Sequence, residues 1–163
     1  IPLPGQRILT GSTPNSISIA FTTNISRTGE RNQYRQSQSD GVAYALSIEE
    51  GMDTSRPLIV RTLWTPTDGS AGNVALEVDY RVVTTGDVLD GTLTDTGLVQ
   101  TVASSAVTNA LQPEVLHEID VSSAVPGDVL VFSHFRNAGV GTDTYSNNVN
   151  IVERTMIGSY WHN

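Results

Sequence analysis

NVALEVDYRVVT, residues 73–84, is the stretch that decides the fold of this chain. Apolar side chains occupy alternate positions in it, and charged side chains fall between them: Val74, Leu76, Val78, Tyr80 and Val82 against Glu77, Asp79 and Arg81. Successive side chains of a β-strand point to opposite faces. The alternation therefore predicts a strand with one face in a hydrophobic core and the other in water.

Similar strand patterns recur on both sides of this stretch. Further strands are expected at 16–22, 42–48, 58–64, 93–107, 115–121, 128–136 and 148–161, with 93–107 either one irregular strand or two short ones. Turn signals such as Pro126-Gly127 separate them, and no segment has a convincing helical period. About eight strands without a helix predict an all-β fold, a two-sheet antiparallel jelly-roll sandwich.

Two of the expected strands are apolar on both faces. Residues 58–64 (LIVRTLW) form a dense β-branched and aromatic run, which is typical of a strand near the middle of a sheet. In the last strand, Val149 and Ile151 lie on one face, while Val152 and Met156 make the other face apolar too. That strand is expected either at the centre of a sheet or beneath another subunit.

The polar segments outside these strands set the domain boundaries. Residues 1–15 contain three prolines and show no strand or helix period, so they are predicted to form an extended N-terminal arm, with the jelly-roll domain at 16–163. Residues 23–40 carry Arg27, Arg31 and Arg35 at four-residue spacing. Gly29 and the lack of apolar partners favour a long exposed loop over a helix with three aligned cations.

Composition narrows the classes of partner. The chain has 163 residues, a length usual for one domain, and a formal net charge of −8. An acidic protein repels phosphate backbones and anionic lipid headgroups, so neither nucleic acid nor a membrane is an expected partner. The absence of cysteine excludes disulfides and thiolate metal sites, and no apolar run is long enough to span a membrane.

The titratable residues show no pattern typical of a catalytic or metal site. His117, His134 and His162 lack the spacing that would bring two ligands to one metal, and His134 is expected at a surface or interface. Ser133 and His134 are neighbours on a strand, so their side chains point to opposite faces and cannot form a dyad. Two acidic groups, Asp87 with Asp90 and Asp143 with Asn147 and Asn148, fit turn chemistry better than a calcium loop. We expect no catalytic, cofactor-binding or metal-binding residue.

Aromatic residues are the remaining candidates for recognition, because an aromatic face can stack on the apolar face of a sugar ring. Most of them fall on predicted inward faces, which favours core or interface packing. Tyr145 lies in a loop of Asp, Ser and Asn residues and is the first candidate for an exposed recognition residue. Trp64 is the second candidate.

Two blocks of the sequence resemble a family of bacteriophage virion domains found in tail fibres, tailspikes and capsid surfaces. They are LWTPTDGSAGNVALEVDYRVVTTGDVLDG, residues 63–91, and PGDVLVFSHFRNAGVGTDTYSNNVNIVERTMIGSYW, residues 126–161. The shared features are an aromatic-Pro turn, Gly-Asn-Val opening a long strand, a Tyr-Arg-Val strand running into Gly-Asp, a later Pro-Gly-Asp, and a strand ending in Phe-x-Arg. This resemblance implies a jelly-roll fold assembled as a homotrimer on the exterior of a phage particle, and it carries over no catalytic residue.

This resemblance, together with the lack of a catalytic pattern, implies a non-enzymatic structural protein of the virion exterior. It would be either a tail-fibre or tailspike domain for host attachment or a capsid decoration protein that stabilises the head. Its partners would be its own copies, other virion proteins and, in the attachment role, a host-surface glycan. A lectin-like carbohydrate-binding module and a glycan-active hydrolase are the alternatives, since fold alone excludes neither.

Overall fold

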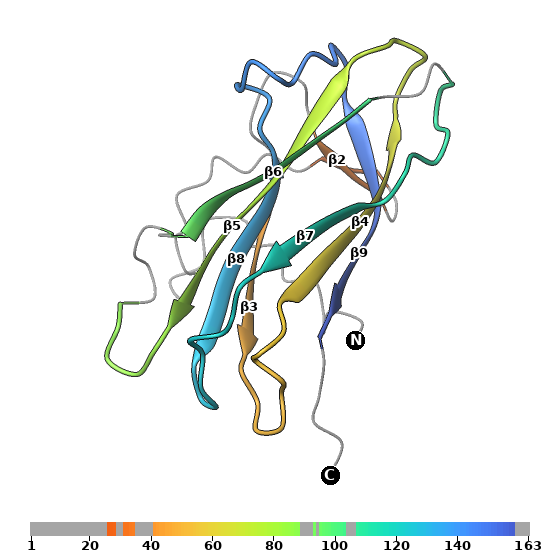
Figure 1. The fold of residues 1–163 in the computed structure, drawn as a ribbon. Coiled ribbons are helices and arrows are strands. Elements are labelled where there is room, and N and C mark those ends of the chain that lie inside the picture. The colour runs from red at the N-terminus through yellow and green to blue at the C-terminus, as the bar shows by residue number, and fades with distance from the viewer. Residues whose placement is uncertain are drawn as a thin grey trace.

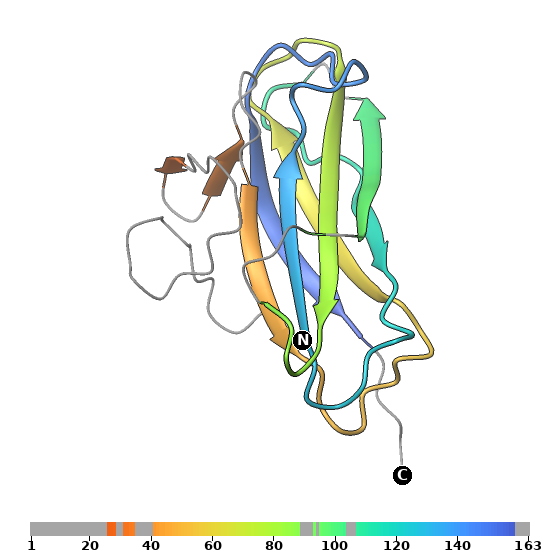
Figure 2. The same cartoon turned by 90° about the vertical axis from the view of Figure 1, so that its left-hand side faces the viewer.

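The computed structural model of the chain describes residues 26–28, 31–34, 41–88, 93, 95–103 and 107–158. They form two antiparallel sheets that stand face to face (Figures 1 and 2). The strands are β1 (Ser26–Thr28), β2 (Arg31–Tyr34), β3 (Gly41–Ser47), β4 (Leu58–Pro66), β5 (Asn73–Val83), β6 (Asp95–Ala103), β7 (Val115–Ile119), β8 (Val129–Arg136) and β9 (Val149–Ile157). No helix within these residues is long and apolar enough to cross a membrane.

Most strands that follow each other in the sequence lie in different sheets. One sheet has the order β1-β2-β9-β4-β7 and the other has the order β3-β8-β5-β6. A chain that crosses from sheet to sheet in this way encloses one core between two inner faces. The predicted all-β class and the two-sheet antiparallel sandwich are confirmed.

Strand β5 shows how the sequence pattern becomes a buried face. Val74, Leu76 and Val78 are completely buried between the sheets, as the alternation predicts. The other face is less hydrated than predicted, because Glu77 is also buried and accepts a hydrogen bond from Asn137 Nδ2 at 2.7 Å. The loop that follows β8 thus covers part of the outer face of β5.

Strand β9 contains a β-bulge that changes which residues point inward. Leu63 pairs with Glu153 and Trp64 pairs with Ile151, so Val152 is an extra residue in β9. Ile151 is buried, Val152 and Glu153 are exposed, and Arg154 is buried again. Regular alternation from Ile151 would turn Glu153 inward and Arg154 outward. The bulge therefore directs an arginine into the core.

One predicted loop needs correction, and two other predicted segments fall on residues that the structure does not describe. The predicted loop at 23–40 is wrong for Ser26–Thr28 and Arg31–Tyr34, which are strands because main-chain pairing to each other and to β9 does not require apolar alternation. The predicted arm at 1–15 and strand at 16–22 lie outside the described residues.

β9 takes a central place, between β2 and β4, which agrees with its two apolar faces. β4 is also internal, but the outward-facing Ile59, Arg61 and Leu63 are only half-buried.

The hydrophobic core consists of two clusters. One contains Leu58, Val60, Met156 and Ile119 from the five-stranded sheet, packed on Val78, Leu130 and Phe132 from the other sheet. The second contains Trp64, Val115, Val149 and Ile151, packed on Val74 and Leu76, with Tyr34 and Tyr145. On the inner face of β4, Thr62 separates the two clusters. On the inner face of β8, His134 is the next residue after Phe132, which belongs to the first cluster. Polar side chains therefore lie between the two apolar parts of the core.

Candidate functional site

Five polar side chains from five strands form a layer between the two core clusters. We call this set the inter-sheet polar layer: Tyr34, Thr62, His117, His134 and Arg154. His134 comes from β8 in the four-stranded sheet, and the others come from β2, β4, β7 and β9 in the five-stranded sheet. All five are buried, and Arg154 has the most exposure, at 7%.

His134 is the centre of this layer. Its Nδ1 accepts a hydrogen bond from Arg154 Nε at 3.2 Å and lies 3.1 Å from the Tyr34 hydroxyl, while its Nε2 lies 3.1 Å from Thr62 Oγ1. The Tyr34 hydroxyl accepts a bond from Arg154 Nη2 at 2.5 Å and donates to the His134 carbonyl at 2.9 Å. One imidazole thus contacts three strands of the opposite sheet.

These contacts fix the protonation state of His134. Arg154 Nε can only donate, so His134 Nδ1 must carry a lone pair. The proton of a neutral imidazole then sits on Nε2, where it is donated to Thr62 Oγ1. Burial, and after it the charge of Arg154 and the neighbouring His117, holds the pKa of His134 well below its usual value.

His117 adds a second buried imidazole. Its ring is 5.7 Å from that of His134 and nearly perpendicular to it. His117 Nε2 bonds to the Leu76 carbonyl at 3.0 Å, across the space between the sheets, while Nδ1 has no hydrogen-bond partner among the described residues. Burial lowers the pKa of His117, and the bond to the carbonyl opposes this only partly.

Arg154 is buried with neutral acceptors instead of a carboxylate. Its guanidinium group lies 5.1 Å from the centre of the Tyr34 ring and bonds to Tyr34 and His134. The third nitrogen, Nη1, has no hydrogen-bond partner within the described part of the chain. No ion pair of Arg154 is found there either, although a buried charge is costly unless it is compensated.

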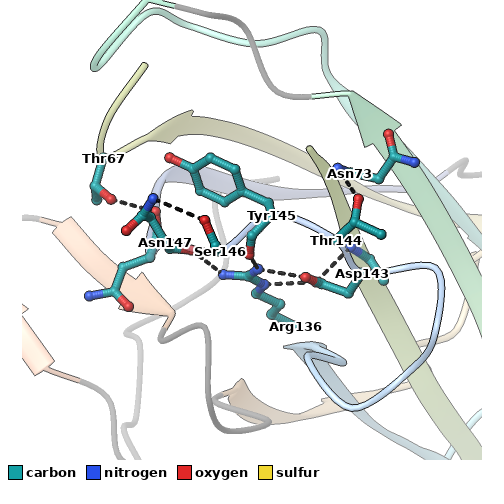
Figure 3. A network of polar contacts seen from close by, with 10 residues as sticks. Thr67, Asn73, Arg136, Asp143, Thr144, Tyr145, Ser146 and Asn147 are labelled. Carbon is teal, nitrogen blue, oxygen red and sulfur yellow. Dashed lines mark hydrogen bonds and ion pairs between the residues drawn. The ribbon is translucent and has the colours of Figure 1, made fainter. Parts of the chain in front are cut away.

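A second polar cluster lies where the loop from β8 to β9 folds over the end of the sandwich (Figure 3). We call it the loop-end network: Arg136, Asp143, Tyr145 and Asn147. Arg136 is completely buried and binds both carboxylate oxygens of Asp143, through Nε at 2.8 Å and Nη2 at 2.6 Å. It also donates to the carbonyls of Tyr145 and Asn147 at 2.5 and 2.6 Å. This arginine is therefore paired with a carboxylate and with the main chain of the loop.

The same network attaches the loop to β5 and to the β4–β5 loop. Asp143 Oδ2 accepts the Ala75 amide at 3.0 Å, and the Asn73 carbonyl accepts the Tyr145 amide at 2.9 Å. The Tyr145 hydroxyl donates to Asp68 Oδ1 at 3.1 Å. Hydrogen bonds to Ser70 and Tyr145 lower the pKa of the Asp68 carboxyl, the main-chain bond from Ser70 contributing most.

The two residues expected to be exposed for recognition are both buried. Tyr145 is 1% exposed, because its ring packs in the second core cluster and its hydroxyl is held by Asp68. Trp64 is 0% exposed, because β4 points it into the same cluster. The prediction that these side chains form an exposed stacking surface is wrong. The polarity of the surrounding loop residues accounts for the error at Tyr145, whereas the burial of Trp64 agrees with the apolar run 58–64 in which it lies.

The remaining sequence candidates are engaged in other contacts or lie elsewhere. The expectation of a surface or interface histidine at position 134 is wrong, since its alternation on β8 turns it into the core. Ser133 points away from His134, as predicted, and its hydroxyl donates to the Asp79 carbonyl at 3.4 Å. Asp143 is bound by Arg136, and Asp87 accepts the Thr84 amide in a turn. Asp90 and His162 lie outside the described residues.

Within the described ranges, no group of three or more His, Cys, Asp or Glu side chains is placed to hold a metal ion. The buried polar groups contact one another and the main chain across the two sheets. Their arrangement can hold the sheets together and can respond to protons, since it contains two imidazoles. Tyr34, Arg136 and Arg154 were not predicted as site residues from the sequence.

Comparisons with known proteins identify no family for the chain. No family model and no curated protein sequence matches it. Among solved structures, an arabinose-bound α-L-arabinofuranosidase, MgGH51, is similar over 78% of this chain and 19% of its own length, at 13% sequence identity and a TM-score of 0.42. The chain therefore spans about a fifth of that enzyme, and this similarity says nothing about activity.

Proposed function

We propose that the chain is a jelly-roll domain, the finer topology that its sheet order supports. The strands pair as nested partners: β2 with β9, β3 with β8, β4 with β7, and β5 with β6. A long antiparallel hairpin that is rolled so that its strands alternate between two sheets has this pairing. Jelly rolls of eight strands occur in viral capsid proteins and in lectins.

The domain serves a structural, non-enzymatic role as a homotrimer on the exterior of a bacteriophage particle, in a tail fibre or tailspike or on the capsid. The resemblance of residues 63–91 and 126–161 to phage virion domains supports this location. One observation supports self-assembly: the outer face of the five-stranded sheet exposes apolar side chains on β7 and β9, the two strands that flank β4. Val152, Ile157 and Leu116 are 50%, 44% and 39% exposed.

These side chains belong to one continuous face. Ile59 pairs with Ile157 on one side and with Glu118 on the other, and Arg61 pairs with Leu116 and Thr155. The half-buried Ile59 and Leu63 extend the apolar area, and charged side chains lie among these residues: Arg61, paired with Glu114, stands between Ile59 and Leu63 on β4. Protein–protein interfaces commonly combine apolar side chains with arginine, which supports this face as the contact between subunits.

The use of the polar groups supports a role without catalysis. The buried histidines, arginines and Asp143 bind one another and the main chain. The net charge of −8 would keep an exposed particle protein soluble. In this role, the buried face gives cohesion and the outer face gives contact between subunits.

The test of assembly is the mass of the purified chain in solution at micromolar concentration. The proposal predicts a trimer, and predicts that the double substitution Leu116→Glu/Ile157→Glu yields a folded monomer. Val125→Glu, at a loop residue that is 58% exposed, is the matched control and should leave the trimer intact. A wild-type monomer would contradict the proposal, as would a trimer that survives the double substitution.

The virion location is tested separately by labelling purified phage particles with antibodies against the chain and viewing them by electron microscopy. Label on the head indicates a capsid decoration protein, and label on the tail indicates a fibre or tailspike domain. Particles without label would contradict the virion assignment even if the trimer is found.

A further inference from the structure

We propose that the inter-sheet polar layer is a pH-dependent switch. It holds the two sheets together while His134 and His117 are neutral, and it releases them when these imidazoles are protonated. The inference does not depend on the proposed function. It rests on the placement of two imidazoles and one guanidinium group between the core clusters.

The contacts of this layer join one sheet to the other. His134, on β8, bonds to Thr62 on β4 and Arg154 on β9, which belong to the opposite sheet. His117, on β7, bonds to the Leu76 carbonyl on β5, also in the opposite sheet. Loss of these bonds therefore weakens the packing of the sheets on each other instead of the pairing within a sheet.

Protonation of His134 changes its contact with Arg154 from attractive to repulsive. A proton on Nδ1 faces the Nε–H of Arg154 across 3.2 Å, so a donor meets a donor and two cations become neighbours. The Tyr34 hydroxyl, 3.1 Å from Nδ1, already accepts from Arg154 Nη2 and donates to the His134 carbonyl. The bond from Arg154 Nε to Nδ1 is lost when Nδ1 becomes a donor, and the second lone pair of the Tyr34 hydroxyl is the acceptor left for the new proton among the described residues.

Protonation of His117 adds a further buried charge. Its Nε2 already donates to the Leu76 carbonyl, and its Nδ1 would become a donor without an acceptor among the described residues. The two rings are 5.7 Å apart, so the second proton is opposed by the first. Opening of the sandwich relieves both charges, because water then solvates them.

The other elements around His134 contribute no neutralising charge from the described residues. Its cross-strand neighbours are Val42 on β3 and Val78 on β5, and β4 contributes the neutral Thr62. β2 contributes Tyr34, β7 contributes His117 and β9 contributes Arg154. Two residues further along β8, Arg136 is paired with Asp143. In the described part of the chain, the charged or titratable groups nearest to His134 are therefore basic or phenolic.

The sign of the pH effect follows from these contacts. The pKa of each buried imidazole is lowered by folding, so the unfolded chain binds more protons below about pH 6.5 and stability falls as the pH falls. Each group can raise the unfolding equilibrium constant by up to about tenfold per pH unit, and both together by up to about a hundredfold. Glu77, whose pKa burial raises, acts in the opposite direction at lower pH.

The test measures urea unfolding of the full chain between about pH 7.5 and 5, above the range in which most carboxyl groups titrate, with the fluorescence of the buried Trp64 as a probe. For the wild type we expect the unfolding constant to rise more than tenfold per pH unit below about pH 6. His117→Gln should reduce this slope to that of one group. His162→Gln is the control substitution and should leave the slope unchanged.

Two results would contradict the proposed pH-dependent switch. One is an unfolding constant that does not change over this pH range, and the other is a wild-type slope that His117→Gln leaves intact. Titration of the wild-type imidazoles by nuclear magnetic resonance gives a second readout that needs no substitution at the buried His134. Two histidines that titrate in the folded protein near their ordinary value would equally contradict the proposal.

Discussion

Among the described residues, two arginines are buried, and they are stabilised by different means. Arg136, at the end of β8, binds both oxygens of Asp143 and two loop carbonyls. Arg154, in the middle of β9, binds a neutral imidazole and a phenol, and one of its nitrogens has no hydrogen-bond partner in the described part of the chain. An arginine–carboxylate pair keeps both charges over the range in which imidazole titrates. The contacts of the loop-end network should therefore persist over this pH range, whereas those of the inter-sheet polar layer should depend on pH.

The largest expected effect comes from removing the carboxylate of the loop-end network. Asp143→Ala leaves the fully buried Arg136 without its counter-ion, so we expect a loss of about 3–5 kcal/mol in the free energy of unfolding. Urea unfolding at neutral pH measures it. Arg56→Ala is the control, because its ion pair with Asp53 has an arginine side chain that is 71% exposed and should matter little. An equal loss in both variants would show that Arg136 does not need Asp143.

The loop-end network can also be broken from the backbone. A Cβ at Gly72 would lie 2.6 Å from Tyr145 Cα, a contact that requires the main chain to move. We expect Gly72→Ala to destabilise the domain by about 1–3 kcal/mol. Gly139→Ala, in the β8–β9 loop, meets its nearest atom at 3.8 Å and should be neutral. Thermal unfolding of both variants tests this, and equal melting temperatures would exclude a tight approach at Gly72.

In the inter-sheet polar layer, Thr62→Val removes the acceptor of the His134 Nε2 proton while keeping the shape of the side chain. The buried N–H group then lacks a partner, which costs about 1–2 kcal/mol at neutral pH. Chemical unfolding measures the loss. A variant as stable as the wild type would mean that His134 does not donate to Thr62.

The smallest effect at neutral pH, and the most informative, is expected for Arg154→Met. It removes a buried charge together with two hydrogen bonds, so the net change should be within about 1 kcal/mol. Near pH 5 we expect the variant to be more stable than the wild type, because protonated His134 no longer faces a guanidinium group. A difference between the two proteins that stays constant with pH would contradict the distinction between the two arginines.

Much of the fold could be predicted because burial and alternation agree along the strands. β5 is an example, since its apolar positions 74, 76 and 78 all face the core. The strands at Ser26–Thr28 and Arg31–Tyr34 could not be predicted in this way, because they are polar and form by main-chain pairing.

The polar layer was not predictable for a related reason. A single extra residue at Val152 decides that Arg154 points inward, and a bulge has no signature in residue type at this position. His134 does fall on the inward face of β8 by simple alternation with Phe132, and that signal was available. The burial of Tyr145 depends on Arg136, at the end of β8, which binds its carbonyl, and on Asp68, in the β4–β5 loop, which binds its hydroxyl. The residue types of the loop that holds Tyr145 do not reveal these contacts.

The protonation state of His134 in the folded protein tests the central claim most directly. Nitrogen-15 chemical shifts of the imidazole distinguish a lone pair on Nδ1 from a proton there, and they can be followed from about pH 7.5 to 5.5. We expect the neutral form with its proton on Nε2 throughout this range for as long as the protein remains folded. A His134 that carries protons on both nitrogens in the folded sandwich at about pH 6 would contradict the account.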